Sequence, residues 1–199
     1  MLQVIGRASS INVRKVLWTC VEVGLPFERV DAGPDHAALN PNRLVPVIRD
    51  GDFVLWESNS ICRYLARQYG RGDLLPTEPR AQADVERWMD WQAGELNNAW
   101  RYAFMALVRK SPAHTDPAQI AASIAHWNRH IGMLEAPLLQ SGAFVTGAAF
   151  TLADVVIGLS LQRWLMTPIE RPLLRAVLRY HARLLNRPGF IAHGANGEP

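Results

Sequence analysis

Cysteine is scarce in this chain of 199 residues, which contains only Cys20 and Cys62. Two distant cysteines without a CxxC motif are too few for a disulfide framework, and their spacing does not suit a zinc site or a two-cysteine redox site. Both fall within segments of helical spacing, so we interpret them as inert packing residues. So little cysteine also favours a reducing compartment, and we expect a cytoplasmic location.

The chain also lacks a long hydrophobic run. Its longest uncharged stretch, residues 136–153, contains Pro137 and Gly142 together with several polar side chains. Such a stretch is unsuited to crossing a membrane. The N-terminus shows no basic segment followed by an apolar one. We therefore expect neither a membrane anchor nor a secretory signal.

Lysine is scarce as well, since only Lys15 and Lys110 occur and arginine supplies almost all of the positive charge. The formal net charge is +3, and the arginines are spread along the chain rather than gathered in one stripe. A spread surplus is typical of a solvated surface, so we expect no nucleic-acid partner. With 49% hydrophobic and 20% charged residues, the composition is that of a globular protein with one large or two small domains.

The first third of the chain alternates between strand-like and helix-like segments. A strand, a helix and a strand precede a loop rich in Gly, Pro, Asn and Asp, which leads into a hairpin and a second helix. The Asp50-Gly51 pair between two apolar runs is a strong hairpin signal. The segments are residues 1–5, 12–23, 26–30, the loop 31–43, 45–48, 53–56 and 58–69. This order predicts βαβ followed by ββα.

Beyond residue 70 the strand signal fades and helical spacing takes over. The Gly- and Pro-rich segment 70–79 is the best candidate for a domain boundary. Helical stretches follow at residues 80–109, 117–139, 152–166 and 172–185. The predicted fold class is α/β plus all-α, with an N-terminal domain at residues 1–77 and an all-helical C-terminal domain at residues 80–199.

Five short motifs occur in a fixed order along the chain. They are Ser9-Ser10-Ile11-Asn12-Val13-Arg14-Lys15-Val16, Asn40-Pro41, Val45-Pro46-Val47-Ile48, Trp56-Glu57-Ser58-Asn59-Ser60-Ile61 and Phe150-Thr151-Leu152-Ala153-Asp154. This ordered set resembles the glutathione transferase superfamily, and more closely its bacterial, theta-like and nu-like branches. The resemblance covers essentially the whole chain. It implies a thioredoxin-like domain that binds glutathione as co-substrate, an all-helical domain that lines the acceptor site, and a homodimer.

Ser10 and Asn12 stand where the first helix begins, and they are the candidate catalytic residues. A thiol with a pKa of about 8.5 is only slightly ionised at pH 7, so an enzyme must stabilise the thiolate. A helix N-terminus with a hydroxyl or amide donor does so. By resemblance, Ser10 matches the theta-type serine and the nu-type threonine, and Asn12 matches the nu-type asparagine. Simple helix capping is the alternative role, and Ser9 is a competing serine.

The resemblance places the peptide part of glutathione against two further motifs. Val45 and Pro46 match the family's cis-proline dipeptide, which would turn the Val45 backbone toward the cysteinyl part; a trans proline at the start of a strand is the alternative. Glu57 and Ser58 match the Glu-Ser motif, in which a helix start grips the γ-glutamyl carboxylate and the acidic side chain meets the α-ammonium group. An ordinary helix cap is the alternative there.

One departure from the family concerns the glycyl carboxylate of glutathione. Relatives commonly carry a basic residue two positions before the proline, and Leu44 stands at that position here. Arg43 precedes it and is the candidate for a shifted contact, whereas Asn42 offers only a neutral hydrogen bond.

The resemblance also directs attention to the first long helix of the second domain, which faces the glutathione sulfur in the family. Trp100, Arg101 and Phe104 are therefore candidates for the acceptor wall, with Trp164 as a further one. Most aromatic residues at helical spacing belong instead to the core.

Two other patterns are interpreted as structural. Thr151 and Asp154 form the S/T-x-x-D pattern of a capping box, which stabilises a helix start. His126 and His130 have the i, i+4 spacing of metal ligands, but no third ligand is near in sequence and no metal is predicted.

These observations predict a glutathione transferase that activates the thiol for attack on a hydrophobic electrophile, or for reduction of a disulfide or peroxide. Two alternatives remain, a non-catalytic glutathione- or ligand-binding protein and a stringent-starvation-like regulator on the same fold. Ser10, Asn12 and the Glu57-Ser58 pair argue against the regulator, because a protein that has lost glutathione binding does not need them.

Overall fold

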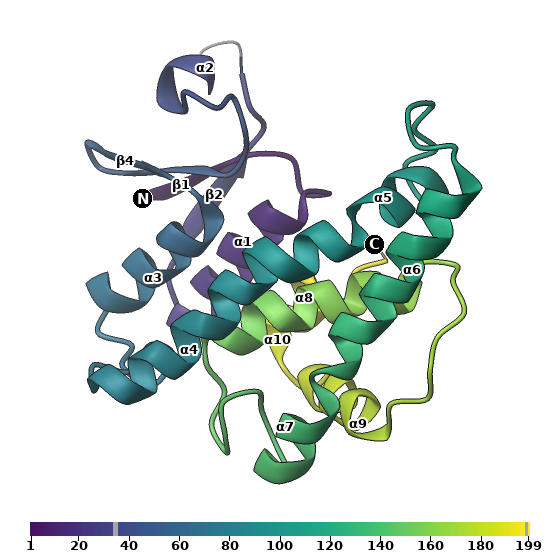
Figure 1. Ribbon diagram of the computed structural model, residues 1–199. Helices are drawn as coiled ribbons and strands as arrows, with labels where there is room; N and C mark the ends of the chain where they lie inside the picture. The colour runs from purple at the N-terminus through teal and green to yellow at the C-terminus, as the bar shows by residue number, and fades with distance from the viewer. Residues whose placement is uncertain (34–35, 198) are drawn as a thin grey trace.

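A four-stranded mixed sheet is built from the first 56 residues in the computed structural model, which describes residues 1–33, 36–197 and 199 (Figure 1). The strands β1 (Leu2–Ile5), β2 (Phe27–Val30), β3 (Val47–Asp50) and β4 (Phe53–Trp56) lie in the order β2-β1-β3-β4. β1 is parallel to β2 and antiparallel to β3, which is antiparallel to β4. With α1 (Ile11–Val23) between β1 and β2, and α3 (Ser58–Gln68) after β4, this is the predicted thioredoxin-like βαβ-ββα order.

Local sequence explains where several of these elements begin and end. Gly24 closes α1 in the left-handed region with φ 76°, which glycine adopts without a steric penalty. The predicted hairpin is confirmed: Asp50 pairs with Phe53 across the two-residue turn, and Gly51 has φ 64°. β3 starts at Val47 rather than at residue 45, because Pro46 has no N–H to donate to a neighbouring strand; the Val45-Pro46 bond is cis.

The segment 31–43, predicted as a loop, contains one short helix, α2 (His36–Leu39). It is a single turn, closed by the Asn40 N–H donating to the His36 carbonyl at 3.2 Å. A turn of four residues carries no periodicity, and for that reason the sequence pattern missed it. Pro34 and Asp35 of the predicted loop lie outside the described residues.

The strand register brings three segments of the chain to one edge of the sheet. Ile5 at the end of β1 pairs with Val47 at the start of β3, and Val47 pairs with Trp56 at the end of β4. The residues just after β1, just before β3 and just after β4 therefore meet at this edge. These are the segments that carry Ser10, Val45-Pro46 and Glu57-Ser58.

The rest of the chain is helical, as predicted. Its elements are α4 (Pro79–Trp91), the π-helical turn η1 (Gln92–Leu96), α5 (Asn97–Leu107), α6 (Pro117–Gly132), α7 (Glu135–Ser141), α8 (Leu152–Met166), α9 (Arg175–Leu184) and α10 (Pro188–His193). The bounds of α8 agree with the prediction. The predicted helix 117–139 is in fact two helices separated near Met133, and α10 was not predicted because it lies beyond the last periodic stretch.

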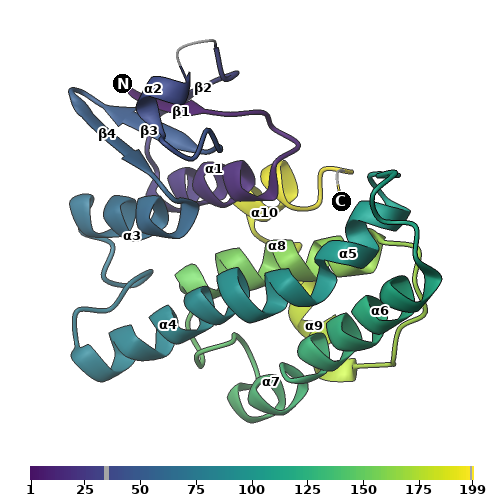
Figure 2. The same ribbon diagram turned by 45° about the horizontal axis from the view of Figure 1, so that its top comes forward.

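The π-helical turn interrupts the long predicted helix 80–109. Within it the Asn97 N–H is directed to the carbonyl of Gln92, five residues back, instead of four. Figure 2 shows α4, η1 and α5 running as one long rod past α8. Turns of this kind insert an extra residue in a helix and occur often at functional sites.

α1 is the central support of the fold. It packs between the sheet and α8, and it also contacts α3 and α10 (Figure 2). Its fully buried Trp18 lies against glycines of two other helices: a Cβ added at Gly158 would lie 3.1 Å from the Trp18 ring, and one at Gly189 would lie 2.3 Å from it. These close approaches are possible only because glycine has no side chain.

Thr151 and Asp154 form the predicted capping box at the start of α8. The Asp154 carboxylate is fully buried and accepts hydrogen bonds from the Thr151 N–H at 2.9 Å, the Val145 N–H at 3.0 Å and the Tyr180 hydroxyl at 2.9 Å. Burial raises the pKa of Asp154 to about 6, against the effect of these donors. The box thus ties the preceding loop and α9 to the start of α8.

Among residues 1–33, 36–197 and 199, no helix combines the length and apolar character required to cross a bilayer.

Candidate functional site

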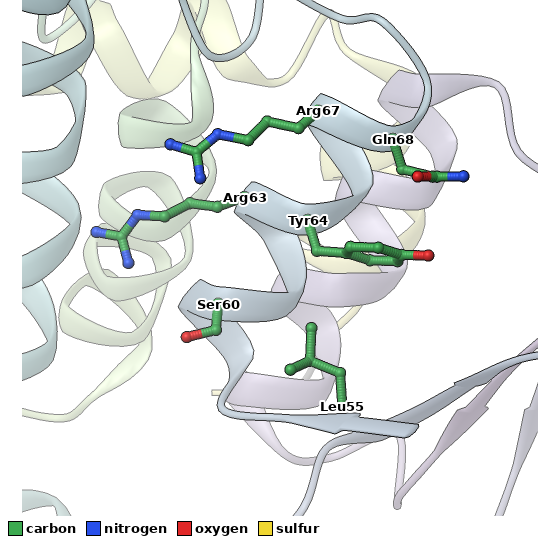
Figure 3. Close-up of a pocket in the computed structure, with 6 residues that line it drawn as sticks. All are labelled: Leu55, Ser60, Arg63, Tyr64, Arg67 and Gln68. Atoms are coloured by element: carbon green, nitrogen blue, oxygen red, sulfur yellow. The ribbon is translucent and has the colours of Figure 1, made fainter. Parts of the chain in front are cut away.

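Two hollows on the surface deserve comparison. One, of about 490 Å³, lies on the outer face of α3, where Arg63 and Arg67 extend to one side and Tyr64 and Gln68 to the other (Figure 3). It contains none of the candidate site residues. The other, of about 420 Å³, lies between the start of α1 and α5 and contains several of them. We call the second hollow the cleft and take it as the candidate active site.

The cleft has two walls. One is the segment between β1 and the first turn of α1, and the other comes from the helical part of the chain. The residues that line it are Arg7, Ser9, Ser10, Ile11, Asn12, Asn97, Trp100, Arg101, Phe104, Met105, Arg109, His114 and Arg163. The structure therefore brings Ser10 and Asn12 to the same cleft as Trp100, Arg101 and Phe104.

Ser10 occupies the N-cap position of α1, yet its side chain makes no capping hydrogen bond. The first intrahelical bond runs from the Arg14 N–H to the Ser10 carbonyl at 3.0 Å, so the N–H groups of residues 11–13 have no acceptor four residues back. Asn12 is half-buried within this first turn. The cleft thus receives a hydroxyl, an amide and the positive end of a helix dipole, a combination that stabilises an anion such as a thiolate. Ser9 lines the cleft too.

Val45 lies close to the start of α1, although it does not line the cleft. A Cβ added at Gly6 would lie 2.6 Å from the Val13 side chain on α1 and 2.8 Å from the Val45 Cβ. Within the described part of the chain, no hydrogen bond engages the backbone N–H or C=O of Val45. The cis bond to Pro46 and this unpaired backbone are the arrangement that an extended peptide ligand would need.

Glu57 and Ser58 open α3 at the same sheet edge and also lie outside the cleft lining. Glu57 is exposed and has φ 73°, a left-handed conformation that a non-glycine residue seldom adopts. Such conformations concentrate at functional sites. Ser58 is buried at the first position of the helix.

Arg43, the candidate for the glycyl carboxylate, lies on the loop before the cis bond and outside the cleft lining. Its side chain is exposed, and its backbone is left-handed with φ 55°. Asn40 shapes this loop by donating from Nδ2 to the Leu44 carbonyl at 2.7 Å and accepting from the Asn42 N–H at 2.9 Å. The contact of Arg43 with a ligand stays a prediction.

A buried polar network lies behind the cleft and was not found by sequence reasoning. Lys15 Nζ donates to Asn59 Oδ1 at 3.2 Å and to Gln92 Oε1 at 2.6 Å. Gln92 Nε2 in turn donates to Asn97 Oδ1 at 3.0 Å, and Asn97 also accepts from Trp100 Nε1 at 3.1 Å. The network therefore connects the start of α3 with the helical wall of the cleft.

Lys15 is the donor at the centre of this network, and burial of its ammonium group is electrostatically unfavourable. Its side chain is fully buried, and desolvation lowers the pKa of Lys15 to about 8, with Arg163 and Arg63 adding to the effect. Interactions with Cys62 and Glu57 oppose that shift in the pKa. Helical spacing gave no signal for this role, because Lys15 lies on the side of the helix opposite to Val13, Val16 and Leu17.

Trp164 is the one aromatic candidate that the structure does not bring to the cleft. It is 1% exposed, and its Nε1 donates to Asn128 Oδ1 on α6 at 2.8 Å. Its position among helices of the core explains why aromatic content alone misplaced it.

The cleft contains arginines that sequence reasoning missed, namely Arg7, Arg109 and Arg163. Arg163 comes from α8, a mostly apolar and largely buried helix. The signal that could have found it is a single arginine within the mostly apolar stretch 152–166, since a buried charge requires a special environment.

The cysteines are packing residues, as predicted. Both are fully buried, and burial raises the pKa of Cys62 to about 11 although the Thr19 hydroxyl donates to its sulfur at 3.2 Å. His130 Nδ1 lies 2.7 Å from the His126 carbonyl. In the described ranges no group of three or more His, Cys, Asp or Glu side chains is placed to hold a metal ion.

Comparison with known proteins agrees with this geometry. The family model "Glutathione S-transferase, N-terminal domain" matches residues 9–68. Glutathione S-transferase GstB of Escherichia coli (strain K12) is 40% identical over 204 residues, covering 89% of this chain and 98% of the relative. Glutathione S-transferase theta-1 of Bos taurus is 34% identical over 126 residues, 60% of this chain and 52% of the relative.

Solved structures give the same result over nearly the whole chain. The glutathione-bound theta class glutathione S-transferase from Xanthomonas axonopodis pv. citri superposes with a TM-score of 0.89 at 36% identity, covering 97% of this chain and 96% of that one. This chain belongs to the glutathione S-transferase family.

Proposed function

We propose that this protein is a glutathione transferase whose cleft holds the glutathione thiol as a thiolate beside Ser10 and Asn12. The observation that carries the proposal is the Ser10 hydroxyl, which stands at a helix N-terminus, takes no part in capping and lines the cleft. Relatives similar over nearly the whole chain are named glutathione S-transferases, and one similar structure holds glutathione. Thioredoxin-like and helical parts would form two domains, at residues 1–77 and 80–199.

The sheet edge supplies the groups that hold the peptide part. The unpaired backbone of Val45, before cis Pro46, pairs with the cysteinyl residue as an added strand would. The start of α3 at Ser58 receives the γ-glutamyl carboxylate, and Glu57 accepts from the α-ammonium group. Arg43 is proposed for the glycyl carboxylate.

Thiolate formation is the chemical contribution of the cleft. Each unit by which the site lowers the thiol pKa represents about 1.4 kcal/mol of preferential binding of the thiolate. The Ser10 hydroxyl, the Asn12 amide and the free N–H groups of the first turn of α1 supply that preference. The thiolate then attacks an acceptor held by Trp100, Arg101 and Phe104, which form the opposite wall. Reduction of a disulfide or peroxide by the same thiolate is the second candidate reaction. It is supported by the presence of both the Ser10 hydroxyl and the Asn12 amide in the cleft lining.

The hollow on α3 is proposed as part of a homodimer interface (Figure 3). Phe53 and Val54 of β4 are exposed beside it, and the Phe53 ring packs on Tyr64 with centroids 5.0 Å apart. Exposed apolar side chains next to a hollow are typical of an interaction surface. Light scattering on the purified protein measures the oligomeric state, and a monomer at every concentration would reject this part of the proposal.

A cytoplasmic location is also proposed.

The decisive experiment is glutathione binding by calorimetry, with ultraviolet thiolate absorbance followed against pH. The wild type is expected to bind glutathione and to lower the thiol pKa. The Ser10→Ala variant is expected to bind the peptide but to lose most of the pKa shift, and Ser9→Ala serves as the matched control. Absence of glutathione binding by the wild type at millimolar concentration would overturn the proposed function.

A further inference from the structure

The cleft carries positive charge that no acidic side chain balances. Four of its lining residues are arginines, Arg7, Arg101, Arg109 and Arg163, and none is an aspartate or glutamate. Across residues 1–33, 36–197 and 199, none of these four arginines forms an ion pair with an aspartate or glutamate side chain. A concave surface of one charge sign focuses the electrostatic field and attracts ligands of the opposite sign.

Arg163 is the most unusual of the four. It is only 3% exposed, and its Nε has no hydrogen-bond partner among the described residues. Its Nη2 is 3.4 Å from the Pro199 carbonyl oxygen. Burial and the nearby charges of Arg14 and Arg109 lower the pKa of Arg163 to about 9. A buried guanidinium with an unused donor, set among like charges, is stabilised when an anion enters beside it.

The arginines and the aromatic rings are arranged together. The Arg163 guanidinium lies 4.6 Å from the centroid of the Trp100 ring and 4.1 Å from that of Phe104. Arg109 lies 5.4 Å from the Phe104 centroid. A flat apolar group packs against such rings while an attached anion meets the guanidinium groups.

The position of the charge separates it from the glutathione-binding groups. Arg101, Arg109 and Arg163 come from the helical wall, whereas the groups proposed for glutathione lie at the sheet edge. The helical wall faces the acceptor in the proposed function, on which this inference rests. We propose that the preferred acceptor is an aromatic electrophile that carries a carboxylate, rather than a neutral hydrophobic one.

The reaction that tests this is substitution on 4-chloro-3,5-dinitrobenzoate, with its methyl ester as the neutral partner. The thiolate sulfur forms a bond to the ring carbon that holds chlorine, and chloride leaves with the electron pair of the C–Cl bond. The thiol proton passes to solvent when the thiolate forms. The acid and the ester have the same chlorodinitrophenyl ring and differ only in the carboxylate or ester group. To correct for the intrinsic reactivity of each compound, its enzymatic kcat/KM is divided by the rate constant of its uncatalysed reaction with glutathione.

We expect this corrected kcat/KM to be at least about tenfold higher for the acid than for the ester, as a charge-assisted contact implies. Arg109→Gln and Arg101→Gln are expected to remove most of that preference while the KM for glutathione and the thiol pKa stay unchanged. Arg80→Gln, on the exposed start of α4, is the matched control and is expected to keep the preference. A preference for the ester, or a higher KM for glutathione as the main effect of Arg109→Gln, would overturn the inference.

Binding of unreactive analogues of the acceptors tests this inference separately from the proposed function. 3,5-Dinitrobenzoate and its methyl ester have no leaving group, and calorimetry measures their affinities directly. Tighter binding of the acid that Arg109→Gln abolishes supports the inference even if glutathione is not turned over, which would reject only the proposed function. Turnover of both chlorinated acceptors with equal binding of the two unreactive compounds rejects only the inference.

Discussion

The two walls of the cleft are built in different ways. The wall that carries Ser10 and Asn12 is one continuous stretch, residues 7–12, which follows β1 and enters α1. The opposite wall gathers residues from α5, from the loop after it and from α8, which are up to 66 positions apart (Asn97 to Arg163). The first wall is therefore fixed by local backbone geometry, whereas the second depends on how helices pack.

This difference determines what each wall contributes. A helix start offers N–H groups, a dipole and a capping side chain at fixed positions, so a thiolate finds the same partners whatever the remaining helices do. A wall of packed side chains changes with each substitution. We therefore propose that the helical wall determines the choice of acceptor and that the sheet side activates glutathione. The following predictions test that division, beginning with the largest expected effect.

Ser10→Ala is expected to lower kcat/KM about 10²-fold, because it removes a donor to the developing or bound sulfur anion. The affinity for glutathione should change little, since the groups proposed to hold the peptide lie at the sheet edge. Steady-state kinetics and thiolate absorbance at several pH values measure both quantities. If Ser9→Ala produced the larger loss, the activating residue would be Ser9.

Gly189→Ala is expected to destabilise the protein by about 2–3 kcal/mol, because a Cβ at this position would lie 2.3 Å from the Trp18 ring. The loss affects both walls, since Trp18 joins α1 to the helical part. Gly132→Ala is the matched control, because nothing lies within 4 Å of its added Cβ. Urea unfolding followed by circular dichroism gives the two free energies. Equal stability of both variants would contradict the packing described at Trp18.

Lys15 should make stability depend on pH. Because the native pKa of Lys15 is lowered to about 8 from 10.5, the unfolded chain binds more protons between these values, and the free energy of unfolding should rise with pH there. The total rise is on the order of 3 kcal/mol. Lys15→Met should lack this rise. The Cys62 thiol contributes in the opposite direction, since burial raises its pKa from 9.0 to about 11. Because the Lys15 charge lowers the pKa of Cys62, this opposing contribution should be at least as large in the variant, and the difference between the two proteins should still grow with pH.

The test is urea unfolding of both proteins at pH 7.5 and pH 9.5, taken as a difference between wild type and variant. A difference that does not grow with pH would show that Lys15 keeps an ordinary pKa. The Lys15→Met variant also lacks the hydrogen bonds from Lys15 to Asn59 and Gln92, which should weaken the contact between α3 and the helical wall.

Trp164→Phe is expected to have the smallest effect on activity. Trp164 lies outside the cleft lining, so kcat/KM for every acceptor should stay unchanged, whereas loss of the hydrogen bond to Asn128 costs about 1 kcal/mol of stability. Trp100→Phe, on the cleft wall, is the comparison and should change the KM for the acceptor. A change in acceptor preference in the Trp164 variant would mean that residues behind the cleft lining also determine which acceptor binds.

Sequence reasoning succeeded where local chemistry decides the structure. The Asp50-Gly51 hairpin, the capping box at Thr151 and the placement of Ser10 at a helix start all follow from short-range rules. It failed where packing decides. α10 packs on Trp18 through Gly189, and Arg163 of α8 joins Trp100 and Phe104 of α5 in the lining of the cleft. No spacing within the sequence contains these long-range contacts.

The π-helical turn at Gln92–Leu96 sets the rotational phase of the helix that follows it. One residue corresponds to about 100° of rotation in an α-helix, so the extra residue turns α5 relative to α4 by roughly that angle. Gln92 can thereby face inward to Lys15 while Trp100 and Arg101 face the cleft on the same rod. Deleting a single residue from this turn would keep the helix and its composition, yet rotate the helical wall away from Ser10.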